Sequence, residues 1–196
     1  MRRWNISSWR VWLFRSLVAV AAGLMLVSFI MPWWTANLDV MAEIKDPIRI
    51  YGHGLQHNLV ELRQYIETDE TPFYQTVLAW VFIAASVGLI LFSIWLKGKK
   101  GRWLMGGIGL IYIAYVAIAV FVVISGRLGE LGIQLQGPTF VPGYLHPEAM
   151  TGGVPYGANM HTTLRFGYYL AYIAGGMCIV LALLRNIITG RPKLGT

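Results

Sequence analysis

Acidic residues are few in this chain and unevenly placed. Only nine of the 196 residues are Asp or Glu, and none occurs in residues 1–38, 71–129 or 149–196. These segments carry most of the Lys and Arg instead: Arg2, Arg3, Arg10, Arg15, Lys97, Lys99, Lys100, Arg102, Arg185, Arg191 and Lys193. Basic residues beside apolar spans mark the cytoplasmic side of a membrane protein. The pattern predicts that both termini and the middle basic segment are cytoplasmic, with two large loops outside.

Charge of either sign is scarce. Charged residues make up 13% of the chain, hydrophobic residues 56%, and the mean hydropathy is +0.56. This is too apolar for an ordinary soluble domain. A net charge of +7 can indicate nucleic-acid binding, but here the basic residues flank spans, where anionic head groups attract them. We expect one integral membrane domain, residues 1–196, that contacts the lipid bilayer and no nucleic acid.

Cysteine is almost absent, and a cleavable leader is not indicated. The single cysteine, Cys178, lies in an apolar run, so no disulfide within the chain can hold the outer loops. The first apolar run continues to Met31-Pro32-Trp33-Trp34. It is also long enough to span a membrane, so we expect it to remain as the first span.

Four apolar stretches lie at residues 11–30, 76–96, 103–125 and 166–184. Each is close to the length of roughly 20 residues that a helix needs to cross a bilayer. Arg15 is the only Asp, Glu, Lys, Arg or His in them, and it lies close enough to one end to reach the interface. This disfavours coupled transport, transmembrane electron transfer and small-solute permeation. Small residues recur at helix-packing spacing: Ala84, Gly88, Gly106, Gly107, Gly109, Ala171 and Gly175. The expected fold is an all-α four-helix transmembrane bundle, its small residues packing helices together or contacting another subunit.

The first outer loop, residues 35–73, divides into two parts. Thr35–Tyr51 favours short extended pieces, because Pro47 breaks a helix and apolar residues alternate with polar ones. After Gly54, apolar residues at i, i+4, i+7 and i+11 predict an amphipathic helix whose apolar face needs a cover. The cover is the membrane surface, the second loop or another protein. The expected partner-binding residues are Trp33, Trp34, Leu55, Leu59, Leu62 and Ile66.

The second outer loop, residues 126–163, begins with a segment that could extend the third helix. From Gly137 onward Gly and Pro are too frequent for regular structure. Long loops of this kind are usually contact surfaces or disordered. Arg127 and Arg165 flank the loop and Glu130 is a counter-ion for either, which predicts a structural ion pair.

Three short motifs carry a family resemblance: Pro32-Trp33-Trp34, Gly54-Leu55 and Phe166-Gly167-Tyr168. With the four-span layout, they resemble the claudin and peripheral-myelin-protein group. The resemblance implies a structural or accessory protein that acts through its outer loops and lateral contacts, without catalysis. The chain departs from the family pattern after Gly-Leu, where Gln56-His57-Asn58 stands in place of a cysteine pair. The family's disulfide-stabilised outer sheet therefore does not carry over directly.

One set of residues could bind a metal ion. On a helix, His53, His57 and Glu61 share one face at i, i+4 and i+8, a spacing at which imidazoles and a carboxylate approach one divalent ion. Ligands from elsewhere could complete a zinc or copper site: His146, Glu148, His161, Met41, Met150 and Met160. The same face is also the solvent face that any amphipathic helix needs. Both interpretations stay open.

Motifs for catalysis are missing. The sequence contains no nucleophile motif, P-loop or dinucleotide fingerprint. The first hypothesis is a non-enzymatic accessory or scaffold subunit without a cofactor, in the cytoplasmic membrane of a prokaryote, that binds a larger membrane complex or a like protomer. The alternative is an extracytoplasmic metal- or cofactor-binding subunit that uses the loop histidines. A small-solute permeation protein is a third, weaker hypothesis.

Overall fold

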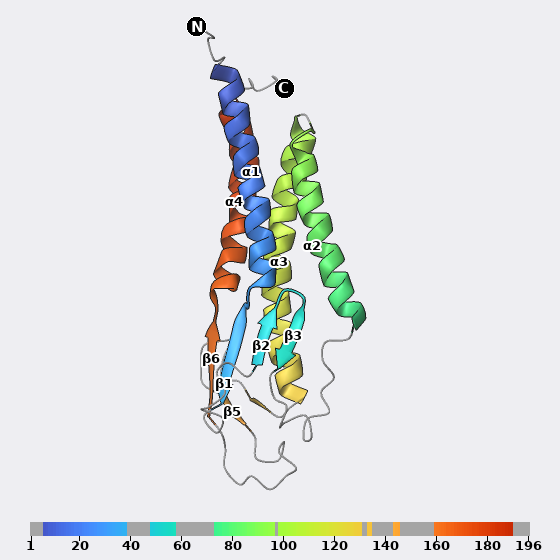
Figure 1. Ribbon diagram of the computed structural model, residues 1–196, viewed down its shortest axis with the longest axis vertical. Helices are drawn as coiled ribbons and strands as arrows, with labels where there is room; N and C mark the ends of the chain where they lie inside the picture. The colour runs from blue at the N-terminus through green and yellow to red at the C-terminus, as the bar shows by residue number, and fades with distance from the viewer. Residues whose placement is uncertain are drawn as a thin grey trace. The chain divides into compact units, whose positions relative to one another are not determined.

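The computed structural model describes residues 6–38, 48–57, 73–96, 98–130, 133–134, 143–145 and 159–189. Its helices are α1 (Ile6–Ile30), α2 (Phe73–Ser93), α3 (Lys99–Glu130) and α4 (Phe166–Ile188) (Figure 1). Its strands are β1 (Trp34–Leu38), β2 (Ile48–Tyr51), β3 (Gly54–His57), β4 (Ile133–Gln134), β5 (Gly143–Leu145) and β6 (Asn159–Leu164). The chain divides into two compact units. The first comprises Met1–Val27, Val81–Ala114 and Leu170–Thr196, and the second comprises Ser28–Trp80 and Tyr115–Tyr169.

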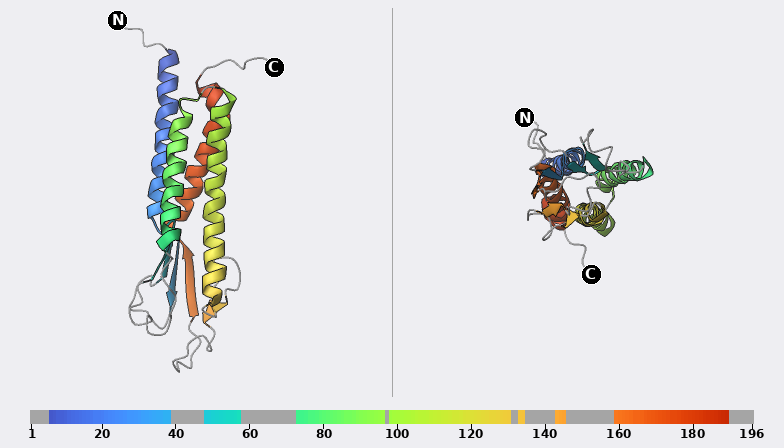
Figure 2. Two further views of the ribbon diagram at one scale, coloured as in Figure 1. Left: turned by 90° about the vertical axis from the view of Figure 1, so that its right-hand side faces the viewer. Right: turned by 90° about the horizontal axis from the view of Figure 1, so that it is seen from below.

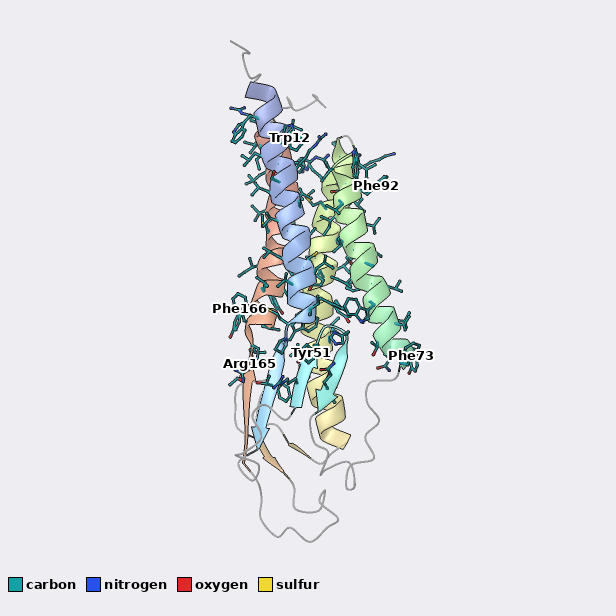
Figure 3. All side chains as sticks on the ribbon, viewed as in Figure 1. Trp12, Tyr51, Phe73, Phe92, Arg165 and Phe166 are labelled. Carbon is teal, nitrogen blue, oxygen red and sulfur yellow. The ribbon has the colours of Figure 1, made fainter. Side chains whose placement is uncertain are left out.

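The first unit is helical and apolar on both its inner and outer surfaces. Segments of all four helices run alongside one another, and Figure 2 shows them from two further sides. Tyr112 is buried and its hydroxyl donates to the Met25 carbonyl at 3.1 Å. Trp12 and Phe92 point outward from α1 and α2 (Figure 3). A helix that is apolar all round belongs in a core or a membrane.

Four described helices are long and apolar enough to cross a membrane. The candidate spans are Trp9–Ile30, Phe73–Ser93, Lys99–Phe121 and Phe166–Ile188. Each overlaps one of the four spans that the sequence predicts. The prediction of a membrane-compatible helical protein is therefore confirmed at this level.

Glycines bring α3 and α4 together in the first unit. A Cβ placed on Gly109 would lie 2.7 Å from the Gly175 carbonyl oxygen, so the two backbones meet directly. This agrees with helix packing by small residues. Gly88 on α2 differs, because a Cβ there would meet no atom within 4 Å. Gly88 therefore takes no part in such a close approach within the described chain.

The second unit is built around an antiparallel sheet with the order β3-β2-β1-β6-β5-β4. Its central pair joins β1 to β6 from Trp34↔Leu164 to Leu38↔Met160. Strands β1 and β2 lie where the sequence predicts extended pieces, and α3 continues to Glu130 as its extension requires. Strands from the segment between α1 and α2 and from the segment between α3 and α4 therefore belong to a single sheet.

The predicted amphipathic helix is wrong at its beginning. Leu55 and His57 belong to strand β3, which pairs with β2 from Tyr51↔Gly54 to Ile48↔His57. Gly54 has a φ of 143°, which an L side chain rarely adopts and a continuing helix excludes. The helical spacing of apolar residues is present in the sequence, but the hairpin turn at residues 52–53 determines the local structure. Three of the residues predicted on this helix lie outside the described residues: Leu59, Leu62 and Ile66.

Candidate functional site

His53 lies among aromatic rings in the second unit. It stacks on Tyr51 with ring centroids 5.2 Å apart and on Trp80 at 5.7 Å, while Phe29 is tilted against it at 5.9 Å. Phe29 and Trp80 also contact each other edge to face at 5.0 Å. We call these four residues the His53 cluster. It joins the β2–β3 hairpin, on which Figure 3 labels Tyr51, to the end of α1 and the first turns of α2.

Hydrogen bonds to the backbone of the hairpin turn fix the position of the His53 cluster. The Gly52 amide donates to the Phe29 carbonyl at 3.3 Å, and the Tyr115 hydroxyl donates to the Gly52 carbonyl at 2.7 Å. A Cβ at residue 52 would overlap the Phe29 ring. Only glycine fits at residue 52 without displacing the Phe29 ring. The two glycines of Gly52-His53-Gly54 therefore have separate causes, which are the close approach of Phe29 to Gly52 and the positive φ of Gly54.

The surroundings of His53 favour its neutral form. Burial lowers its pKa below the ordinary value of 6.5, and the backbone of Phe29 acts in the opposite direction as the smaller effect. Its Nδ1 is buried without a hydrogen-bond partner among the described residues, and its Nε2 lies 3.5 Å from Gln56 Nε2. Burial therefore favours the neutral imidazole, which stacks on its aromatic neighbours.

The metal interpretation loses its geometric basis at His57. The expected one-turn spacing requires a helix, whereas His57 is in strand β3. His161 is in β6, three strand spacings from β3 across the sheet, which is roughly 14 Å and too far for direct ligation of one ion. Glu61 and His146 lie outside the described residues. Among the residues that the structure does describe, no group of three or more His, Cys, Asp or Glu side chains is placed to hold a metal ion.

Trp33 joins several elements of the second unit. Its indole Nε1 donates to the Ser28 carbonyl at 2.7 Å, and its amide donates to the Ile50 carbonyl at 2.7 Å. Its ring meets Tyr115 edge to face at 6.0 Å. Trp33 and Trp34 are both 0% exposed. Both side chains therefore belong to the core of the second unit, and their expected role in partner binding stays a prediction.

Arg165 lies where β6 meets α4 (Figure 3). Its amide donates to the Trp33 carbonyl at 2.9 Å, and its Nε donates to Thr35 Oγ1 at 2.7 Å. Thr35 also shares a hydrogen bond of 3.1 Å with Thr163. Arg165 thus has a structural role through Thr35. The side chains of Arg127 and Glu130 lie outside the described part, so the expected ion pair stays a prediction.

Arg185 was missed by sequence reasoning, which counted it only as one of the basic residues near a span. In the first unit it is 6% exposed, and its Nη2 donates to the Leu96 carbonyl at 2.5 Å. Its guanidinium carbon lies 5.5 Å from the centre of the Phe14 ring. A Cβ at Gly101 would overlap the guanidinium. Arg185 therefore stabilises the turn after α2, where helix carbonyls lack partners.

The described residues define a protein of four membrane-compatible helices with a sheet shared by two distant loops. Comparison with protein-family models, with curated proteins and with solved structures found no match to the chain.

Proposed function

We propose that this chain is a non-catalytic accessory or scaffold subunit of a prokaryotic cytoplasmic membrane. Both termini are cytoplasmic, and the sheet of the second unit is extracytoplasmic. The protein binds another membrane protein, or a second copy of itself, through this outer side and through lateral helix contacts. The charge pattern supports the orientation, because all acidic residues lie at residues 39–70, 130 and 148.

The β1–β6 pairing is the observation that carries this proposal. Thr35 and Thr163 are 128 residues apart in sequence, yet their side chains share a hydrogen bond. Trp33 and Arg165 connect this strand pair to the end of α1 and the start of α4. A surface held this way loses little conformational entropy on binding, which favours recognition of a partner.

The motifs that resemble the claudin and peripheral-myelin-protein group support the same proposal. All of them fall in the second unit, where Trp33 is buried and Gly54 completes the hairpin. A Cβ on Gly167 would lie 2.7 Å from the Pro32 carbonyl oxygen, so these two motifs are in direct contact. Hydrogen bonds and buried rings hold this sheet, since the chain's one cysteine is Cys178.

Site-specific photo-crosslinking in native membranes tests the proposal. A photoreactive phenylalanine analogue replaces Gln56 or Thr163, which are exposed on the second unit, and Phe92 serves as an exposed helix control. We expect discrete protein adducts from Gln56 or Thr163, with mass spectrometry showing either one partner or the chain itself. Adducts from Phe92 alone would restrict binding to lateral helix contacts. If no position gives a protein adduct, the proposed function is wrong.

A further inference from the structure

A groove runs between α3 and α4 within the first unit. Its volume is about 280 Å³, and its lining includes Trp103, Gly106 and Gly107 from α3 with Ile179 and Leu183 from α4. The glycines create this space, because a Cβ at Gly107 would meet no atom within 4 Å. The groove lies within two candidate membrane spans, so its natural surroundings are lipid chains.

Apolar side chains line this groove except at Arg102. Trp103 is 78% exposed and Leu183 is 65% exposed, so the groove's margins continue into the apolar outer surface. An aromatic residue next to a basic one is typical of the level where acyl chains meet head groups. The groove therefore has an apolar part suited to a hydrocarbon chain and a cationic end suited to an anion.

Positive charge at the start of α3 favours the binding of an anion there. The first four residues are Lys99-Lys100-Gly101-Arg102, and the first turn contains no acidic residue. The N-terminus of a helix already carries partial positive charge, and anions are favoured there. No Asp or Glu occurs anywhere in the sequence of the first unit. The first unit therefore supplies no Asp or Glu as a counter-ion for Arg102.

We propose that this groove binds an anionic glycerophospholipid. Its head-group phosphate lies at the first turn of α3 beside Arg102, and one acyl chain occupies the space over Gly107 next to Ile179. Basic pockets between membrane helices commonly bind anionic head groups. The apolar groove adds a specific place for one acyl chain. Electrostatic attraction of basic residues to the membrane surface alone does not provide such a place. This inference is independent of the proposed binding of a partner protein.

Native mass spectrometry of the full-length protein tests the site, with dioleoylphosphatidylglycerol and dioleoylphosphatidylcholine as probes. Wild type is expected to retain the anionic lipid preferentially. Arg102→Gln should lower its retention about fivefold, the effect of one cation near a membrane surface. Gly107→Leu should lower retention of both lipids, because a Cβ at this position meets no atom within 4 Å and the rest of the side chain would take up space in the groove.

Two variants control for unspecific effects. Gly88→Leu places the same side chain at an open position on α2, and Arg10→Gln removes an exposed cation from α1. Both should retain lipid as wild type does. Equal retention of the two lipids by wild type, or unchanged retention in Gly107→Leu, would overturn the proposal. A loss of dimers in Gly107→Leu with unchanged lipid retention would instead identify the groove as a helix interface, and this also overturns it.

Discussion

At the scale of single residues, His53 is held by stacking rather than by charge. Tyr51 and Trp80 lie almost parallel to it, with interplanar angles of 27° and 25°. Both rings stack on the imidazole, and burial favours its neutral form. The role that remains is to connect a hairpin to two helices.

Replacement of His53 by Phe should remove part of the protein's acid sensitivity. The unfolded chain takes up a proton near pH 6.5, whereas the folded chain resists protonation until a lower pH. Stability is therefore complete above about pH 6.5 and is lost as the pH falls toward the lowered pKa. Thermal unfolding in one detergent from pH 8 to pH 5 should show a larger loss for wild type than for His53→Phe. The other three histidines are common to both proteins, so parallel curves would contradict this account.

Arg185 allows a second prediction at this scale. Arg185→Met keeps the length of the side chain but removes its bond to the Leu96 carbonyl. Hydrogen bonds from charged groups contribute roughly 1.5–3 kcal/mol, and the variant should be destabilised by about that much. Arg15→Met, an exposed position on α1, should change stability by less than about 0.5 kcal/mol. Denaturant unfolding in detergent measures both, and equal effects would refute the capping role.

Residue roles could be predicted from the sequence only where local pattern determines them. Arg165 was expected to pair with Glu130, and that ion pair stays a prediction, whereas the hydrogen bond from Arg165 to Thr35 had no signal in the sequence. Trp33 was expected at a binding surface, because an aromatic residue at a span end usually marks the interface. Its burial depends on Ile50 and Tyr115, which the chain brings together only on folding. No local signal contains that contact.

At the scale of elements, the β2–β3 hairpin depends on the absence of a side chain at residue 52. Gly52→Ala forces a methyl group against the Phe29 ring and should cost about 1–3 kcal/mol by overpacking. Gly88→Ala makes the same change at an open helical position, where it should be neutral or stabilising by up to about 1 kcal/mol. Thermal unfolding of the two variants should give opposite signs. Equal effects would mean that the hairpin is not tightly packed on Phe29.

The helices were more predictable than the strands for a physical reason. A membrane span is determined by the composition of about 20 consecutive residues, so hydropathy alone locates it. Strand β1 needs β6, and Asn37 pairs with His161 far along the chain. The apolar spacing at Leu55 suggested a helix, but pairing with Ile50 and the φ of Gly54 make the segment a strand. Strand pairing therefore determined the structure here, against the helical spacing of the apolar residues.

At the scale of the whole molecule, orientation follows from charge rather than from fold. The sequence of the first unit contains no Asp or Glu, although Lys and Arg are frequent there. Cations close to span ends remain on the cytoplasmic side during insertion. Four spans return the chain to its starting side, which predicts that both termini and the α2–α3 turn share one side.

Cysteine accessibility in intact cells measures this orientation directly. Cys178 is buried and is the one native cysteine, so Cys178→Ala gives a background without thiols. On that background, Gln56→Cys and Thr163→Cys should react with a membrane-impermeant maleimide in intact cells. Lys100→Cys, which is also exposed, should react only after permeabilisation. Labelling of Lys100→Cys alone in intact cells would mean the opposite orientation. If Gln56→Cys and Thr163→Cys reacted from different sides, the four-span topology itself would fail, because strands β3 and β6 could not then belong to one sheet.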